Sequence, residues 1–385
     1  MKALITPVRR TGSRHLAAAF ALAIALGACA DDDSGDDATR TSASGTPAAP
    51  TETPAPAGGS TESITLVTYD SFPETDTSLN AALDAFSAQS GIGVELLIAG
   101  DAGSMVSKAV LTAGNPEGDV LFGIDNAFLS RAVEADVFEP YKAEGLDAVP
   151  DELTALVPGG EATPIDYGDV CVNYDIAWFE DAGLEPPADL AALADPAYRD
   201  LLVVENPATS SPGLAFVLAS IAEFGEDGWV DYWTQLRNNG VEVVDGWTEA
   251  YYERFTWAGG GPKPLVVSYG SSPPAEVIFA DPPVDTAPTA AIEATCFRQV
   301  EFAGVLRGTD APEAARQLVD FLLSAPFQSE LALNLFVYPA AAGIALPEEF
   351  EGTAVIPEDP YTVDPATIAA ERESWIETWT DTVLQ

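Results

Sequence analysis

The chain has 385 residues, of which 47% are hydrophobic, so it is long enough to bury a large core in about two lobes. Its formal net charge of −45 argues against nucleic acid as a partner, because phosphate backbones are bound by positive charge. The acidity fits a cationic ligand or, more simply, a solvated acidic surface suited to a salty environment. The only histidine is His15, so the rest of the chain has no Ser-His-Asp triad, no Cys-His pair and no imidazole ligand for zinc.

The first residues have the three-part pattern of a secretory signal. Three arginines precede the apolar run of residues 16–26, which is too short to span a bilayer comfortably. The segment Leu26-Gly27-Ala28-Cys29 resembles a lipobox, the cleavage and lipidation signal of bacterial lipoproteins. We therefore expect residues 1–28 to be a signal peptide, and Cys29 to carry a lipid that anchors the exported protein to the outer face of the cell membrane, on the periplasmic or extracellular side. The alternative for Cys29 is a free or buried thiol. Cleavage removes four basic residues and no acidic one, which moves the formal charge from −45 to −49.

Residues 29–63 read as a tether between the lipid and the folded part of the chain. They are mostly Asp, Ser, Thr, Gly, Pro and Ala, with almost no large apolar side chain. Such a stretch cannot bury enough surface to offset the entropy lost on ordering, so we expect it to be disordered.

An alternating, β-rich run begins the ordered part at residues 64–69, and an amphipathic helical pattern follows over residues 79–86. A second strand is predicted at 94–98, a helix at 105–111 and a third strand at 120–123. This order is a β-α-β-α-β unit, which predicts parallel strands joined by crossover helices.

A second set of strands and helices follows the segment 163–168. The predicted strands are 170–174, 201–204, 241–244, 265–268 and 297–306, and the predicted helices are 213–224, 311–323 and 326–335. When a chain passes from one α/β unit into a second and then back into the first, it forms two lobes. We expect each lobe to be a mostly parallel sheet flanked by helices. We assign residues 64–168 and 298–345 to lobe 1, and residues 169–297 and 346–385 to lobe 2. Ligands of such sheets bind in a crevice at the carboxyl ends of the strands.

Polar and aromatic residues gather at these predicted strand ends. The segments are Tyr69-Asp70-Ser71-Phe72, Gly100-Asp101-Ala102-Gly103-Ser104, Gly123-Ile124-Asp125-Asn126, Asn206 through Gly213, Asp245 through Tyr251, and Ser268 through Pro273. Each segment alone is more often a turn or a helix cap. Together they predict one cleft lined by aromatic rings, carboxylates and hydroxyls.

In this order, from Ile64 to the end of the chain, the segments resemble the thiamine-binding proteins of thiamine ABC importers. The match extends through Asp166-Tyr167-Gly168, Phe336-Val337-Tyr338-Pro339 and Glu371-Arg372-Glu373-Ser374-Trp375. The resemblance implies a two-lobed type II periplasmic-binding-protein fold that binds thiamine and, in some members, its phosphates. It further implies an ABC importer permease as partner, a monomer, no catalysis, no cofactor and no metal.

The resemblance places ligand contacts on nine residues, which are Asp101, Ala102, Ser210, Ser211, Trp247, Tyr269, Gly270, Ser271 and Ser272. The chemistry suits thiamine, because a thiazolium cation and a flat aminopyrimidine both favour aromatic faces. Trp247 and Tyr269 can supply such faces, with Tyr69 and Phe336 as weaker candidates. Asp101 and Asp125 can supply acceptors at the polar edge of the ligand. The competing interpretations are a core position for Trp247 or Tyr269 and a helix-capping role for Asp125.

The sequence departs from the family at two places where other members carry aromatic residues. Thr75 and Asp76 stand at one of them and Ala275 at the other, so fewer aromatic rings are expected to stack on the ligand here.

Cys171 and Cys296 remain after Cys29 is assigned to lipid. Because the protein is exported and each cysteine lies on a presumed crossover strand, we expect a disulfide between them, the alternative being two buried thiols.

Three other functions compete with thiamine import. Asp101 and Asp125 could act as acid and base of an enzyme, but no nucleophile-base pair accompanies them. The same fold could bind ferric iron or a polyamine, although iron proteins of this type use neighbouring tyrosines where this chain has Tyr269-Gly270. Tyr251-Tyr252 is such a pair, but neighbours on a helix are not expected to share a face. The third alternative is a thiamine-sensing receptor domain.

Overall fold

The computed structural model describes residues 62–280, 282–284 and 286–385. These residues form a mixed α/β structure around a ten-stranded sheet with the order β2-β1-β3-β9-β5-β8-β6-β7, in which β10 also pairs with β5 and β4 with β9. The predicted signal peptide, the lipidated Cys29 and nearly all of the tether lie outside the described residues. Among the residues that are described, no helix is both long and apolar enough to cross a membrane.

The predicted β-α-β-α-β unit is present. The strands β1 (Glu62–Thr68), β2 (Ile92–Ile98) and β3 (Val120–Asp125) are parallel, and α1 (Ser78–Ser90) and α2 (Ala102–Leu111) connect them. Each helix begins at a residue whose side-chain oxygen accepts a hydrogen bond from a backbone N–H of the first turn, which is the usual role of Thr and Asp at this position.

Two long antiparallel strands, β5 (Thr163–Asp175) and β9 (Thr289–Leu306), connect the two sides of the sheet. β9 also pairs with β3, and β5 pairs with β8 (Leu265–Tyr269). Both long strands begin several residues before the predicted strands 170–174 and 297–306. The early residues of β5 are buried on both faces, so they lack the alternating pattern by which a strand is read from sequence.

The remaining strands and helices complete the two sides. The strands are β4 (Phe138–Glu139), β6 (Leu202–Glu205), β7 (Glu242–Val244) and β10 (Tyr338–Pro339). The helices are α3 (Leu129–Glu134), α4 (Asp151–Thr154), α5 (Ile176–Ala182), α6 (Ser211–Asn238), α7 (Trp247–Glu249), α8 (Thr256–Gly259), α9 (Ser272–Ile278), α10 (Pro312–Leu322), α11 (Ala325–Asn334) and α12 (Pro365–Val383).

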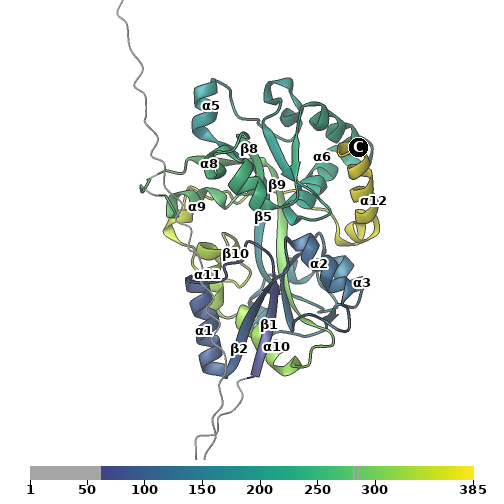
Figure 1. Ribbon diagram of the computed structural model, residues 1–385, viewed down its shortest axis with the longest axis vertical. Coiled ribbons are helices and arrows are strands. Elements are labelled where there is room, and N and C mark those ends of the chain that lie inside the picture. The colour runs from purple at the N-terminus through teal and green to yellow at the C-terminus, as the bar shows by residue number, and fades with distance from the viewer. Residues whose placement is uncertain (1–61, 281, 285) are drawn as a thin grey trace, which may run out of the picture. The chain divides into compact units, whose positions relative to one another are not determined.

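Shorter turns are the 3-10 segments Leu146–Ala148, Ala191–Ala194, Pro196–Tyr198 and Glu348–Phe350, and the π-helical turn Ala250–Arg254. In Figure 1, α1, α10 and α11 lie around β1 and β2, whereas α5, α6 and α8 lie around β8, and β5 and β9 run between the two groups. The assignment of these groups to two lobes with the boundaries given above stays a prediction.

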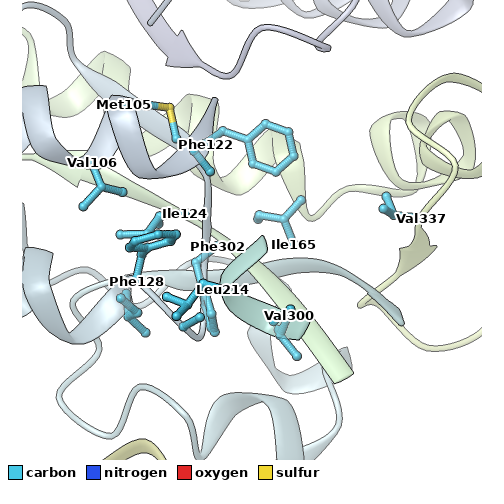
Figure 2. Packing of buried hydrophobic residues seen from close by; sticks show 14 of the residues in the cluster. Met105, Val106, Phe122, Ile124, Phe128, Ile165, Leu214, Val300, Phe302 and Val337 are labelled. Carbon is cyan, nitrogen blue, oxygen red and sulfur yellow. The ribbon is translucent and has the colours of Figure 1, made fainter. Parts of the chain in front are cut away.

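The core beneath the site is made by residues that alternate with polar ones on the central strands. Ile124 of β3, Ile165 of β5 and Phe302 of β9 are fully buried, and Figure 2 shows them packed with Leu214 of α6 and Phe128. Because successive residues of a strand face opposite sides of the sheet, this apolar layer leaves Asp125, Asp166 and Glu301 on the other side.

Cys171 of β5 and Cys296 of β9 form a disulfide, with their Cα atoms 4.1 Å apart. Both cysteines are buried. The bond lies between the two long strands that the sequence identified as crossover strands.

Candidate ligand-binding site

A cavity of about 670 Å³ lies at the ends of β1, β2, β7 and β8 and beside the middle of β9, and its volume is within the size range of small-molecule sites. Its aromatic lining residues are Tyr69, Trp247, Tyr251, Tyr252, Tyr269, Phe279 and Phe336, and its acidic ones are Asp70, Asp76, Asp101 and Glu301. None of the described residues that line it is Lys or Arg. The cavity therefore presents flat apolar surfaces and negative charge.

Trp247 is fixed in place by its neighbours. Its indole Nε1–H donates to Ser268 Oγ at 2.8 Å, and its ring stacks on Tyr251 with centroids 5.0 Å apart and an interplanar angle of 18°. The rings of Tyr252 and Tyr269 meet it edge-on at 5.5 and 6.5 Å. Such a cluster offers a ligand a rigid wall, so little side-chain entropy is lost on binding.

Asp101 connects three helix starts at one edge of the cavity. Its Oδ1 accepts from the backbone N–H of Ala102 at 2.7 Å and, more weakly, of Ser211 at 3.4 Å. Its Oδ2 accepts from the backbone N–H of Trp247 at 3.1 Å. Burial raises the pKa of Asp101 to about 7, and the nearby charge of Asp70 contributes. Near neutral pH this carboxyl is therefore poised between its charged and neutral forms.

Two phenols enter the cavity from the ends of β1 and β8. Tyr69 packs its ring so closely on Gly123 that a Cβ at that position would collide with it, and Gly123 also has φ +99°. Burial and the charge of Glu301 raise the pKa of both Tyr69 and Tyr269 well above the usual range of a phenol, so both stay protonated donors at neutral pH. The hydroxyl of Tyr269 accepts from Gln299 Nε2 at 3.1 Å.

Glu301 forms an acidic part of the cavity wall that the sequence analysis missed. It lies in the middle of β9, where no turn or glycine marks a strand end, and it is only 6% exposed. Its Oε1 accepts from Gln299 Nε2 at 3.0 Å. Burial raises the pKa of Glu301 well above its usual range, and the charges of Asp166 and Asp125 raise it further.

Seven of the eleven predicted contact residues line the cavity, and they are Tyr69, Asp101, Ala102, Ser211, Trp247, Tyr269 and Ser272. The other four do not line it. Asp125 Oδ1 accepts from the backbone N–H groups of Ala127 and Phe128 at 2.7 and 3.0 Å, so it stabilises the turn between β3 and α3, whose own N-cap residue is Phe128.

The remaining three residues sit just behind the cavity wall. Ser210 is the buried N-cap residue of α6. A side chain at Gly270 would collide with the carbonyl oxygen of Val355, and Ser271 Oγ donates to the carbonyl oxygen of Phe336. These residues therefore shape the backbone around the site rather than the surface that meets a ligand.

The structure adds aromatic residues that compensate for the departures from the family. Phe279 lies one helical turn after Ala275 and lines the cavity, and its ring meets Phe336 at 5.7 Å. Phe336 has φ +56°, a strained conformation for a bulky residue, and such strain is concentrated at functional sites. Tyr251 and Tyr252 of the π-helical turn both line the cavity, Tyr251 as a buried residue and Tyr252 with 55% of its surface exposed.

Among the described residues, no group of three or more His, Cys, Asp or Glu side chains is arranged to hold a metal ion. The phenol of Tyr251 donates to Glu276 Oε1 at 2.7 Å, and burial raises the pKa of Tyr251 well above its usual range. A phenol held protonated in this way is a poor ligand for ferric iron.

Comparison with known proteins shows what this chain is similar to. Residues 115–260 match the family described as bacterial extracellular solute-binding protein. A thiamine-binding periplasmic protein of Salmonella typhimurium is 29% identical over 320 residues, which cover 82% of this chain and 92% of that protein. Iron uptake protein A1 of a Synechocystis species is 25% identical over 307 residues, which cover 75% of this chain and 82% of that protein.

A solved structure described as a periplasmic thiamin binding protein superposes with a TM-score of 0.73 at 28% identity, covering 85% of this chain and 98% of that one. The fold is the type II periplasmic-binding-protein fold, and part of the chain is similar to bacterial extracellular solute-binding proteins. The chain resembles the thiamine-binding periplasmic proteins over most of its length, which confirms the resemblance read from the sequence.

Proposed function

We propose that this protein binds thiamine in the cavity between Asp101, Trp247, Tyr269 and Glu301 and delivers it to the permease of an ABC importer. The observation that carries the proposal is the lining itself, which combines seven aromatic residues with four carboxylates and no Lys or Arg among the described residues. A positively charged thiazolium gains from both features, through cation-π contact and through charge attraction. The likeness to thiamine-binding periplasmic proteins supports the same ligand.

Titration of the purified mature protein with thiamine tests the proposal. Trp247 stacks on Tyr251 at the cavity wall, so its fluorescence should change as the cavity fills. The control ligand is the pyrimidine half of thiamine alone, which lacks the cation and should bind much more weakly. Absence of any saturable response to thiamine, by fluorescence and by calorimetry, would contradict the proposal.

We further propose that the protein acts without chemical turnover and as a monomer on a lipid anchor at Cys29. Thiamine recovered from the complex should then be chemically intact. Mass spectrometry of the membrane-associated protein should show a diacylglyceryl-modified peptide beginning at Cys29, and Cys29→Ala should release the protein from the membrane. A Cys29→Ala protein that stays membrane-bound would contradict the anchor.

Ferric iron is the second candidate, because Tyr251 and Tyr252 both line the cavity and an iron uptake protein is among the relatives. Bound ferric iron would give a visible phenolate charge-transfer absorption band. We expect none on addition of ferric citrate, since Tyr251 is held by Glu276. A band that disappears in Tyr251→Phe would favour iron over thiamine.

A further inference from the structure

Three buried carboxylates lie next to one another across the middle of the sheet. Asp125 of β3 is the register partner of Glu301 of β9, and Glu301 is in turn the register partner of Asp166 of β5. Register partners on adjacent strands project to the same face of a sheet. Asp125 and Asp166 are fully buried and Glu301 is 6% exposed. We call these three residues the carboxylate row.

Most oxygens of the carboxylate row have no hydrogen-bond partner among the described residues. Both oxygens of Asp166, Oδ2 of Asp125 and Oε2 of Glu301 are buried and unpaired. Glu301 is also the member of the row that lines the cavity. A buried and unpaired oxygen at a cavity wall is available to a ligand that brings a donor or a positive charge.

The groups that face the row offer it little positive charge. They are Tyr69 after β1, Asp101 before α2, Ser211 of α6, Tyr269 of β8, Gln299 of β9 and Arg372 of α12. Arg372 is the only cation among these described residues, and it acts on Asp125 at one end of the row. Glu301 and Asp166 are left with acidic or neutral neighbours.

Adjacent buried carboxylates without a counter-charge cannot all stay ionised, because each loses its hydration and repels the others. The usual solution is that they share a proton, as paired carboxyl groups in enzymes do. Burial raises the pKa of Asp166 and of Glu301, so both carboxyls bind a proton more readily than exposed carboxyls do. A cation entering the cavity beside Glu301 would supply the missing positive charge.

We propose that the carboxylate row holds a proton while the cavity is empty and that a cationic ligand seated against Glu301 displaces this proton to the solvent. The inference rests on the proposed function and extends it, since it names Glu301 as the residue that distinguishes a charged ligand from a neutral one. Two consequences follow. The cavity selects a cation over a neutral molecule of the same shape, and each binding event releases about one proton.

The first experiment examines the empty protein by infrared spectroscopy at neutral pH. Wild type should show the C=O stretching band of a protonated carboxyl, and Glu301→Gln should weaken it. Glu117→Gln is the matched control, because Glu117 is exposed and lies before β3, at the opposite end of that strand from Asp125. If Glu301→Gln fails to fold, Asp166→Asn tests the same row without changing the cavity lining. Absence of the band in wild type, or a band of undiminished intensity in both row variants, overturns the inference.

The second experiment is calorimetry of thiamine in two buffers of different protonation enthalpy at one pH. Wild type should release about one proton per thiamine, and Glu301→Gln should release less and bind about tenfold to hundredfold more weakly. Thiamine with carbon in place of the thiazolium nitrogen is the neutral ligand of matched shape, and it should bind weakly and release no proton. Equal binding of both ligands to wild type, or no proton release with thiamine, overturns the inference while leaving the proposed function intact.

The proposed function and the inference about the carboxylate row can be refuted independently of each other. If wild type binds no thiamine, the proposed function fails, and the inference is then decided with tetramethylammonium, a small cation that needs no pyrimidine recognition. Loss of the protonated-carboxyl band as tetramethylammonium is added supports the inference, and an unchanged band overturns it.

Discussion

Asp101 and Trp247 are joined by a hydrogen bond in which the backbone N–H of Trp247 donates to Oδ2 of Asp101 at 3.1 Å. The other oxygen of the same carboxyl accepts from the first residue of α2 at 2.7 Å. One side chain from the end of β2 therefore positions the aromatic wall that comes from the end of β7. The carboxyl of Asp101 therefore lines the cavity itself and also fixes the position of Trp247.

We predict that Asp101→Ala weakens thiamine binding by about 1–3 kcal/mol, because backbone N–H groups at α2 and at Trp247 lose their acceptor. Asp101→Asn keeps one acceptor oxygen and should lose less. Calorimetric titration of both variants beside wild type provides the measurement. Equal losses in the two variants would mean that the charge, rather than the hydrogen bonds, is what Asp101 contributes.

The raised pKa of Asp101 also predicts a pH dependence. Its pKa is about 7, so Asp101 becomes protonated as pH falls through 7 and then no longer attracts a cation. Thiamine affinity in wild type should therefore decrease from pH 8 to pH 6. Asp101→Asn should lack the part of this decrease that is centred near pH 7, and an unchanged profile would refute the assignment.

Replacement of Trp247 or Tyr269 by alanine should weaken thiamine binding by about 1–3 kcal/mol each, since apolar contact is lost together with cation-π attraction. Trp257→Ala is the matched control. Trp257 is 40% exposed in the neighbouring helix α8 and does not line the cavity. Calorimetry is preferable to fluorescence because each tryptophan variant alters the optical signal. Unchanged affinity in both site variants would rule out the ring-stacking arrangement.

The carboxylate row should lower stability at neutral pH, and Asp166→Asn should relieve this. Burial raises the pKa of Asp166 above its value in the unfolded chain, so the folded state holds a proton that the unfolded state releases. Linkage then makes the native protein lose stability as pH rises above the unfolded-state pKa of about 3.9. Asp166→Asn should therefore be more stable than wild type at pH 7, and the difference should vanish near pH 3. Urea unfolding at both pH values measures it, and a destabilised variant at pH 7 would contradict the prediction.

The disulfide between Cys171 and Cys296 should leave no alkylatable thiol from these residues in the unreduced mature protein. The two residues are 125 positions apart in sequence, so the bond closes a long loop. Replacing both cysteines by serine should lower the free energy of unfolding by about 2–5 kcal/mol. Intact mass after alkylation and urea unfolding provide the two measurements. Two modified thiols in native protein would refute the prediction.

The cargo should be free thiamine at least as readily as its diphosphate. None of the described lining residues is basic, and the mature chain is strongly acidic, so a diphosphate is repelled at long range. The backbone N–H groups at the start of α6 can still bind a phosphate, so we expect weaker binding rather than none. The difference should narrow as salt rises. A preference for diphosphate that persists at low salt would require a basic group in the cavity that the lining residues do not supply.

The sequence predicted the parts of the site that lie in loops at strand ends. Asp101, Trp247 and Tyr269 follow strands and are accompanied by turn-forming residues, so local pattern was enough to find them. Glu301 was missed because it lies within a strand, where its role depends on the register of β9 against its neighbours. Register between strands far apart in sequence is set by tertiary packing, and no local pattern encodes it.

The helical segments show the same limit. The helix predicted at 213–224 is present and ends where predicted, because Gly225 has non-helical backbone angles, but the second helical part of α6, which continues to Asn238, was not predicted. Tyr251 and Tyr252 lie in a π-helical turn, which no local sequence pattern predicted. Departures from regular helix geometry of this kind are common at functional sites.

The pairing of β3 with β9 has a consequence for how the protein comes to be folded. The first three strands lie within the first third of the chain. β3 lies between β1 and β9 in the sheet, so its pairing with β9 requires a strand that comes much later in the sequence. Contacts between such distant segments form slowly, because a long loop must close before they stabilise anything. A chain with this topology leaves one edge of β3 unpaired until late in folding, and an unpaired strand edge is where a folding chain is most exposed to pairing with another chain.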